Sequence, residues 1–365
     1  MDIFEVEEER FNSSRHFHQY LSQNYDEISE DNLYICSGIT EFTSKEFIEA
    51  IKQEGWEIAD SYGAIELIRS EYQSGYVEAY LSFDEDTGLL FLYTDQRKSE
   101  EIDNAILPLL QKTKGLHYLY IGPRIIRDLC EEIAEEWESS KVTTFIAKRT
   151  SGTEIGAKRR PNTRRTINYY GEDGLRALRE VERDYGVLPH TVEVHIPSKL
   201  RFRVNKEGVF TLKWGELNTL FEYMNTCIRQ TLAMKREYDE TDFDVLEVRG
   251  GEYEIPESKP ATIRLTNRLS VSDIKQIRDR IRDSDYTLLD VFIDESTPTL
   301  SAKVFDKEEN LFFNIELRSD EMLIYPREKS RMGIFLRFFE FIQSEIDDRA
   351  TPKSDENMPI LGEKD

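Results

Sequence analysis

Cations alternate with apolar residues in the stretch Lys199 to Arg203, which reads KLRFR. On a β-strand, side chains two residues apart point to the same face of the sheet, so Lys199, Arg201 and Arg203 would share one face. Guanidinium and ammonium groups bind phosphate, and each neutralised phosphate releases counterions. The pattern therefore favours binding of a polyanion, and nucleic acid is the first candidate.

The residues between these cations indicate which face is buried. We expect three apolar side chains of this strand to point toward covering helices: Leu200, Phe202 and Val204. The next predicted strand has an apolar set of its own: Phe210, Leu212 and Trp214. That alternation leaves Lys213 on the cationic face, so four cations are expected to lie together.

A second basic stretch precedes these strands and has the Gly and Pro content of a loop. Tyr169 and Tyr170 follow it and are placed to stack on bases. The predicted nucleic-acid-binding residues are Lys158, Arg159, Arg160, Arg164, Arg165, Tyr169, Lys199, Arg201, Arg203 and Lys213.

The charge distribution offers these cations other partners. Residues 141–213 hold sixteen Lys and Arg against eight Asp and Glu, a net charge of +8, whereas the whole chain carries −24. The rest of the chain therefore carries −32. A basic face in such a chain is also suited to docking on the chain's own acidic parts or on an acidic partner protein.

Catalytic and metal-binding patterns are weak. Asp244 and Glu247, near Arg249, are faintly similar to a nuclease carboxylate set, but they alternate to opposite faces of their predicted strand. His190 likewise faces away from Glu193 and His195 on its strand. We predict no catalytic residue, no metal site and no cofactor, and keep a metal-dependent nuclease as the third hypothesis.

Composition favours a cytoplasmic protein without membrane contact. The first residues are acidic, unlike a secretory signal, and no apolar run approaches the roughly 20 residues that span a bilayer. The three cysteines are widely spaced and form neither a disulfide framework nor a zinc pattern.

The periodicity predicts an α+β protein with three tandem units, each in the order strand, helix, three strands, helix. Their antiparallel sheets would be covered by helices on one face. The predicted units are residues 33–115, the basic middle unit 164–236, and 261–349. The remaining segments are a polar start (1–32), a connecting strand-helix-strand with the basic loop (116–163), an acidic linker (237–260) and a disordered tail (350–365).

This element order resembles that of the half-repeat of the TATA-box-binding protein and of related helix-grip folds, in topology alone. The resemblance implies that one face of each sheet stays free to bind a partner. The free faces would differ: the first copy exposes Glu78, Tyr80 and Ser82, and the third exposes Ser301 and Lys303. The middle copy alone is basic on this face. We therefore expect a non-enzymatic, nucleic-acid-associated protein that serves as a regulatory or defence-system subunit. The alternative is a protein-interaction scaffold whose basic middle unit docks on an acidic partner.

Overall fold

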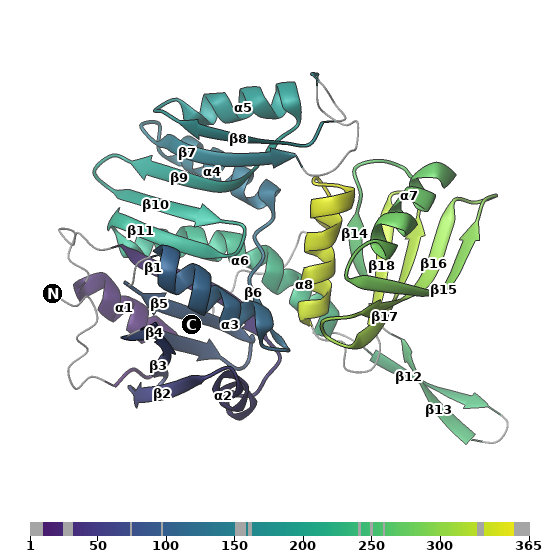
Figure 1. Ribbon diagram of the computed structural model, residues 1–365, viewed down its shortest axis with the longest axis horizontal. Coiled ribbons are helices and arrows are strands. Elements are labelled where there is room, and N and C mark those ends of the chain that lie inside the picture. Colours follow the sequence, from purple (N-terminus) through teal and green to yellow (C-terminus); the bar gives the residue numbers. More distant parts are fainter. Residues whose placement is uncertain are drawn as a thin grey trace. The chain divides into compact units, whose positions relative to one another are not determined.

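The computed structural model shows an α+β protein with two large antiparallel sheets (Figure 1). It describes residues 10–24, 32–73, 75–95, 98–149, 158–159, 163–239, 242–248, 251–257, 260–326 and 332–353. The chain divides into two compact units. The N-terminal unit comprises residues 1–149 and 154–228, and the C-terminal unit comprises residues 150–153 and 229–365.

The N-terminal unit is built on one sheet with the strand order β2-β3-β4-β5-β1-β11-β10-β9-β7-β8, and β6 pairs with β1. Its strands are β1 (Leu33–Thr40), β2 (Trp56–Ser61), β3 (Ile65–Tyr72), β4 (Gly75–Asp84), β5 (Leu89–Thr94), β6 (Leu116–Tyr118), β7 (Lys141–Arg149), β8 (Arg165–Tyr170), β9 (Leu188–Ile196), β10 (Leu200–Asn205) and β11 (Val209–Gly215). Its helices are α1 (Ser14–Asn24), α2 (Ser44–Gln53), the π-helical η1 (Lys98–Ile106), α3 (Leu107–Lys112), α4 (Pro123–Glu136), α5 (Gly174–Tyr185) and the part of α6 (Leu217–Asp239) up to residue 228.

The first and middle predicted units share this single sheet, which corrects the expectation of one sheet each. They join where β1 pairs with β11, with Leu33 opposite Leu212 and Ile35 opposite Phe210. Every residue of β1 is buried, as is typical of a strand covered on both faces. We call β1 to β5 the first half of the sheet and β7 to β11 the middle half.

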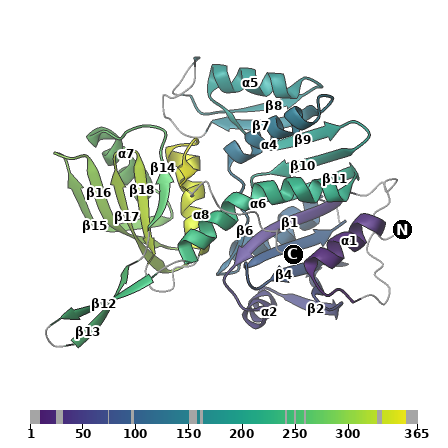
Figure 2. The ribbon, with the colours of Figure 1, turned by 180° about the vertical axis from the view of Figure 1, so that it is seen from behind.

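Helices cover the two faces of this sheet unequally. Figure 2 shows α1, α4 and α6 in front of one face, and α5 lies on the same side, because Arg179 of α5 pairs with Glu131 of α4. The opposite face carries α2, η1 and α3, whose apolar residues pack with those of the first half and with Val209 of β11 in one core. In the middle half, that opposite face has no described helix of the N-terminal unit in front of β9, β10 and the part of β11 after Val209 (Figure 1).

The start of the chain contributes to the core, although its sequence predicts a polar segment. Phe17 of α1 is buried, with its ring 5.8 Å from Tyr80 and 5.2 Å from Tyr93. Tyr80 and Ser82, which the alternation places on a free face, are therefore buried under α1, whereas Glu78 is exposed as expected. The sequence of one strand cannot reveal a helix that packs on it from a distant segment.

The C-terminal unit repeats the topology of the first half. Its sheet has the order β15-β16-β17-β18-β14-β19, and the first half has the corresponding order β2-β3-β4-β5-β1. Its elements are β14 (Ala261–Arg264), α7 (Val271–Arg282), β15 (Tyr286–Asp294), β16 (Thr299–Asp306), β17 (Leu311–Arg318), β18 (Glu321–Pro326), α8 (Met332–Phe341), the π-helical η2 (Ile342–Ile346) and β19 (Thr351–Pro352). The middle half differs, because β7 lies between β8 and β9.

The predicted linker and tail contain strands. A hairpin of β12 (Asp242–Val248) and β13 (Gly251–Glu257) occupies most of residues 237–260. Beyond Arg349, β19 pairs with β14, and residues 354–365 lie outside the described residues.

Local sequence signals explain several helix ends. Thr43 and Glu46 form a capping box at the start of α2, and Ser270 with Asp273 forms a second one at the start of α7. Helix α5 ends at Gly186, whose φ of 67° is readily adopted by glycine.

Candidate nucleic-acid interface

The uncovered side of the middle half, which we call the open face, is formed by five neighbouring strands, β8, β7, β9, β10 and β11. Strand pairing and alternation assign its side chains. They are Lys141, Thr143, Thr144, Ile146, Lys148, Thr166, Asn168, Tyr170, Thr191, Glu193, His195, Arg201, Arg203, Asn205, Thr211, Lys213 and Trp214. The set mixes cations, small polar groups and aromatic rings.

Strand β10 alternates as its sequence predicts. Leu200, Phe202 and Val204 are fully buried on the helix side, and the ring of Phe202 stacks on Tyr223 of α6 at 5.9 Å. Arg201 and Arg203 are half-buried on the opposite side. The apolar residues thus anchor the strand, and the cations between them line the open face.

Glu193 of β9 holds two of the cations. Its Oε1 accepts hydrogen bonds from Nε and Nη2 of Arg201 at 2.9 and 2.6 Å, and its Oε2 accepts one from Nζ of Lys213 at 2.7 Å. Burial by itself would raise the pKa of Glu193, but the hydrogen bonds from Lys213 and Arg201 outweigh it and hold that pKa below its ordinary value. The carboxylate therefore stays ionised at neutral pH and fixes both cations on the sheet.

A β-bulge brings Lys213 to Glu193. The pairing of β10 with β11 shifts between Arg201 and Phe202, so Arg201 faces Trp214 and Lys213 is the extra residue. The Trp214 ring lies 5.6 Å from the ring of His195, on the open face. This corrects the expectation that Trp214 belongs to the buried set, because strict alternation fails across a bulge.

Arg203 keeps donor capacity. It lies opposite Glu193 on β9 and Thr211 on β11, but its Nε is buried and has no hydrogen-bond partner among the described residues. The side chain as a whole is half-buried and forms no ion pair among the described contacts, so its positive charge can still interact with a phosphate. Arg203 is the cation of this face that we consider most available to a ligand.

Lys199 lies apart from the other predicted cations. It follows Ser198, whose φ of 60° marks the turn between β9 and β10. Its Nζ is 2.5 Å from Glu216 and 5.4 Å from the ring centre of Trp137, the residue that follows α4. The turn thus directs Lys199 toward the helices, and three of the four expected cations share the open face.

On the edge strand β8, the predicted contact residues face the helices. The Arg165 guanidinium lies 4.4 Å from the ring centre of Tyr185, and the Tyr169 ring stacks on Phe145 at 5.0 Å. The next residue, Tyr170, is 77% exposed on the open face. Alternation along β8 places the two tyrosines on opposite faces of the sheet. The sequence alone does not say which of the two faces the helices, because that depends on which residues of β8 are buried.

The basic loop is described in part. Lys158, Arg159 and Arg164 are exposed, and Arg159 lies 3.9 Å from Asp184 of α5. Arg160 lies outside the described residues. Several other cations of residues 141–213 pair with nearby acids, and Arg176 with Glu180 is one such pair. These pairs reduce the local positive charge of that stretch.

The weaker catalytic patterns gain no support. In the described part of the chain, no three His, Cys, Asp or Glu side chains gather as metal ligands. Glu193 binds Arg201 and Lys213 instead, and the side chains of Asp244 and Glu247 lie outside the described residues. All three cysteines are buried, and burial raises the pKa of Cys130 to about 12, which disfavours a reactive thiolate. None of the described helices has the length and apolar character needed to cross a membrane.

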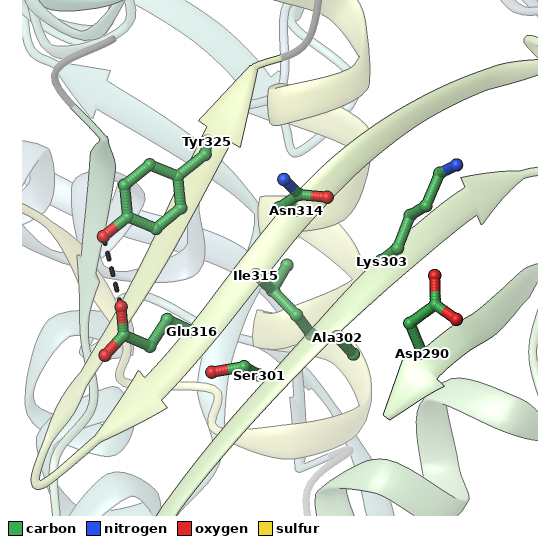
Figure 3. Close-up of a pocket in the computed structure, with 8 residues that line it drawn as sticks. All are labelled: Asp290, Ser301, Ala302, Lys303, Asn314, Ile315, Glu316 and Tyr325. Atoms are coloured by element: carbon green, nitrogen blue, oxygen red, sulfur yellow. Dashed lines mark hydrogen bonds between the residues drawn. The ribbon is translucent and has the colours of Figure 1, made fainter. Parts of the chain in front are cut away.

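The C-terminal sheet also has a face opposite its helices, which we call the second face. It contains a hollow of about 440 Å³ between β15 and β18 (Figure 3). Its polar residues include Ser301, Lys303, Asn314, Glu316 and Tyr325. Ser301 is exposed and Lys303 half-buried, as the alternation predicts. The Tyr325 hydroxyl donates to Glu316 at 3.2 Å.

Comparison with known proteins gives similarity without an assigned activity. The family model AF_0896_M, described as a family middle domain, matches residues 125–207, a range that extends from α4 to β10. A protein of Archaeoglobus fulgidus named "Uncharacterized protein" is 23% identical over 356 residues, which are 94% of this chain and 96% of that protein. The matched middle-domain range contains most of the open face.

Proposed function

We propose that this protein binds nucleic acid through the open face without catalysing a reaction on it. The observation that carries the proposal is a sheet surface that no described helix of the N-terminal unit covers, on which the half-buried Arg203 lies near two cations fixed by Glu193. Phosphate contacts from Arg and Lys supply most of the affinity of such interfaces.

The charge balance of the open face supports a polyanionic ligand. Its strands carry Lys141, Lys148, Arg201, Arg203 and Lys213 against one carboxylate, Glu193, and Glu172, which follows β8, pairs with Lys141. The chain as a whole carries −24, so a polyanion would be repelled by most of the remaining surface. Binding would then be confined to this face and would weaken as salt screens it.

A salt titration with a charge-reversed variant tests the proposal. Binding of labelled DNA and RNA is measured by fluorescence anisotropy at about 50 and 200 mM salt. The variant carries Lys148→Glu and Arg203→Glu, two half-buried cations without an ion pair among the described contacts. Loss of two phosphate contacts should weaken binding and reduce the slope of log K against log salt by about 1.4 to 1.8.

Lys303→Glu is the matched control, because it reverses a half-buried strand cation on the second face. It should leave nucleic-acid binding unchanged. Equal losses in the control and the double variant would indicate a general charge effect, and absence of binding by the unaltered protein would refute the proposal. Tight binding of an acidic protein instead would favour the scaffold hypothesis.

A further inference from the structure

We propose that the ligand of the open face is a single strand of DNA or RNA, with a base stacked on Tyr170. This inference rests on the proposed function and names the class of nucleic acid. It is carried by the placement of the aromatic side chains of the face relative to its cations.

Tyr170 offers a free aromatic surface. It is the most exposed large hydrophobic residue among those described, at 77%, although it lies within a strand that pairs with β7. Its neighbours on the same face of β8 and β7 are short and polar, Asn168 and Thr144, and Thr144 lies directly opposite. A ring with so little covering it can stack on a base, and stacking tolerates any base because each has a π-face.

Tyr170 shares a row of the sheet with the anchoring cation. Pairing places Tyr170 opposite Thr144, Thr144 opposite Glu193, and Glu193 opposite Arg203. With adjacent strands about 4.8 Å apart, the backbones at Tyr170 and Arg203 are separated by roughly 14 Å across the sheet. An extended strand lying across β8, β7, β9 and β10 could therefore place one base on Tyr170 and a phosphate at Arg203.

A second aromatic group lies near the opposite side of the face. Trp214 and His195 are in contact, and both lie beside Arg201 in the pairing. Burial, together with Arg201 and Lys141, lowers the pKa of His195, so its ring is neutral at pH 7. Neutral rings on both sides of a cationic centre suit alternating contacts with bases and phosphates.

Duplex nucleic acid fits this arrangement less well. The bases of a duplex are stacked on one another, so their faces cannot reach Tyr170 or Trp214 unless they are unpaired. A duplex would use the cations alone, and Glu193 already neutralises part of their charge. We therefore expect a preference for single strands that depends on the aromatic residues.

The test compares Tyr170→Ala with the unaltered full chain. Anisotropy is measured with mixed-sequence single-stranded DNA, single-stranded RNA, and a duplex of the same DNA sequence. The variant should lose about 5- to 150-fold in affinity for single strands, the range for one stacked base. Its affinity for the duplex should stay the same, and Tyr170→Phe should restore single-strand binding because phenylalanine keeps the ring.

Tyr76→Ala is the matched control, since Tyr76 is 51% exposed on β4, in the other half of the sheet. It should not change binding, and thermal melting should show that both alanine variants fold. If single strands bind but Tyr170→Ala has no effect, or if the duplex binds as tightly, the inference is wrong while the proposed function stands. If no nucleic acid binds at all, the proposed function itself fails.

Discussion

The open face of the middle half and the second face of the C-terminal sheet are both strand surfaces opposite their covering helices, but they are built for different contacts. On the open face, a buried carboxylate, Glu193, fixes Arg201 and Lys213, and Tyr170 projects from the edge strand. On the second face, Lys303 lies 4.2 Å from the ring centre of Phe312, and Phe292 of the edge strand is 63% exposed. The first surface is cationic with isolated rings, and the second is largely apolar at its edge.

The comparison shows that topology does not decide which face stays free. The first half has the same strand order as the C-terminal sheet, yet α1 covers its corresponding face through Phe17 and Leu21. The middle half has a different order and leaves its face uncovered by the described helices of its unit. Coverage therefore depends on whether a neighbouring segment supplies an apolar helix.

The largest expected effect contrasts a buried and an exposed phenylalanine. Phe202→Glu should unfold the N-terminal unit, at a cost above about 4 kcal/mol, because it buries an unpaired carboxylate between β10 and α6. Phe292→Glu, at an exposed site of the second face, should change the free energy of unfolding by about 0.5 kcal/mol or less. Urea unfolding followed by circular dichroism measures both, and similar losses would show that the two faces are assigned incorrectly.

Acid should destabilise the N-terminal unit before the C-terminal one. Burial lowers the pKa of His18 to about 4 and that of His190 to about 3, with Lys206 and Lys148 adding to the second shift. Both residues take up protons more readily when unfolded, so stability falls as pH drops below the ordinary histidine value of 6.5 and continues to fall toward these folded pKa values. Each contributes up to about 2 kcal/mol between about pH 7 and pH 5.

Tryptophan fluorescence separates the two units in this experiment, because Trp56, Trp137 and Trp214 all belong to the N-terminal unit, as do all five histidines. The urea concentration at the midpoint of fluorescence-detected unfolding should decrease as the pH is lowered from about 7 to about 5. His190→Gln should make this decrease smaller. An equal decrease in the variant would show that His190 is not held neutral in the folded protein.

Neutralising the two glutamates of the faces should have a smaller effect. Glu193→Gln removes the charge that Arg201 and Lys213 share and should cost about 1 to 2 kcal/mol, since both cations remain partly solvated. Glu316→Gln, whose side chain is 31% exposed, should cost under about 1 kcal/mol. The first change should also tighten nucleic-acid binding and steepen its salt dependence, because it frees two cations. Weaker binding would mean that orientation by Glu193 matters more than the charge it removes.

The smallest expected effect concerns Lys303. Lys303→Ala should destabilise the C-terminal unit by about 0.5 to 1 kcal/mol through loss of its contact with Phe312. Nucleic-acid affinity should stay within about twofold, well below the tenfold change that 1.4 kcal/mol would produce. A clear loss of affinity would place the second face in the binding surface and remove the contrast between the two.

The sequence alone determined the local features. Alternation in KLRFR identified the buried and cationic sides of β10, the Thr43–Glu46 spacing located the start of α2, and Gly186 marked the end of α5. These features depend on side-chain direction and backbone hydrogen bonds within a few residues, so a short stretch of sequence is enough to specify them.

Only the tertiary structure decided how these pieces combine. The pairing of β1 with β11 merged two expected sheets, α1 buried Tyr80, and a bulge moved Trp214 to the open face. Glu193, which the charge count treated as one acid among eight, became the centre that holds two cations. Such outcomes depend on contacts between residues far apart in the chain, where burial and register are set by the partner strand and by the helix that happens to lie above it.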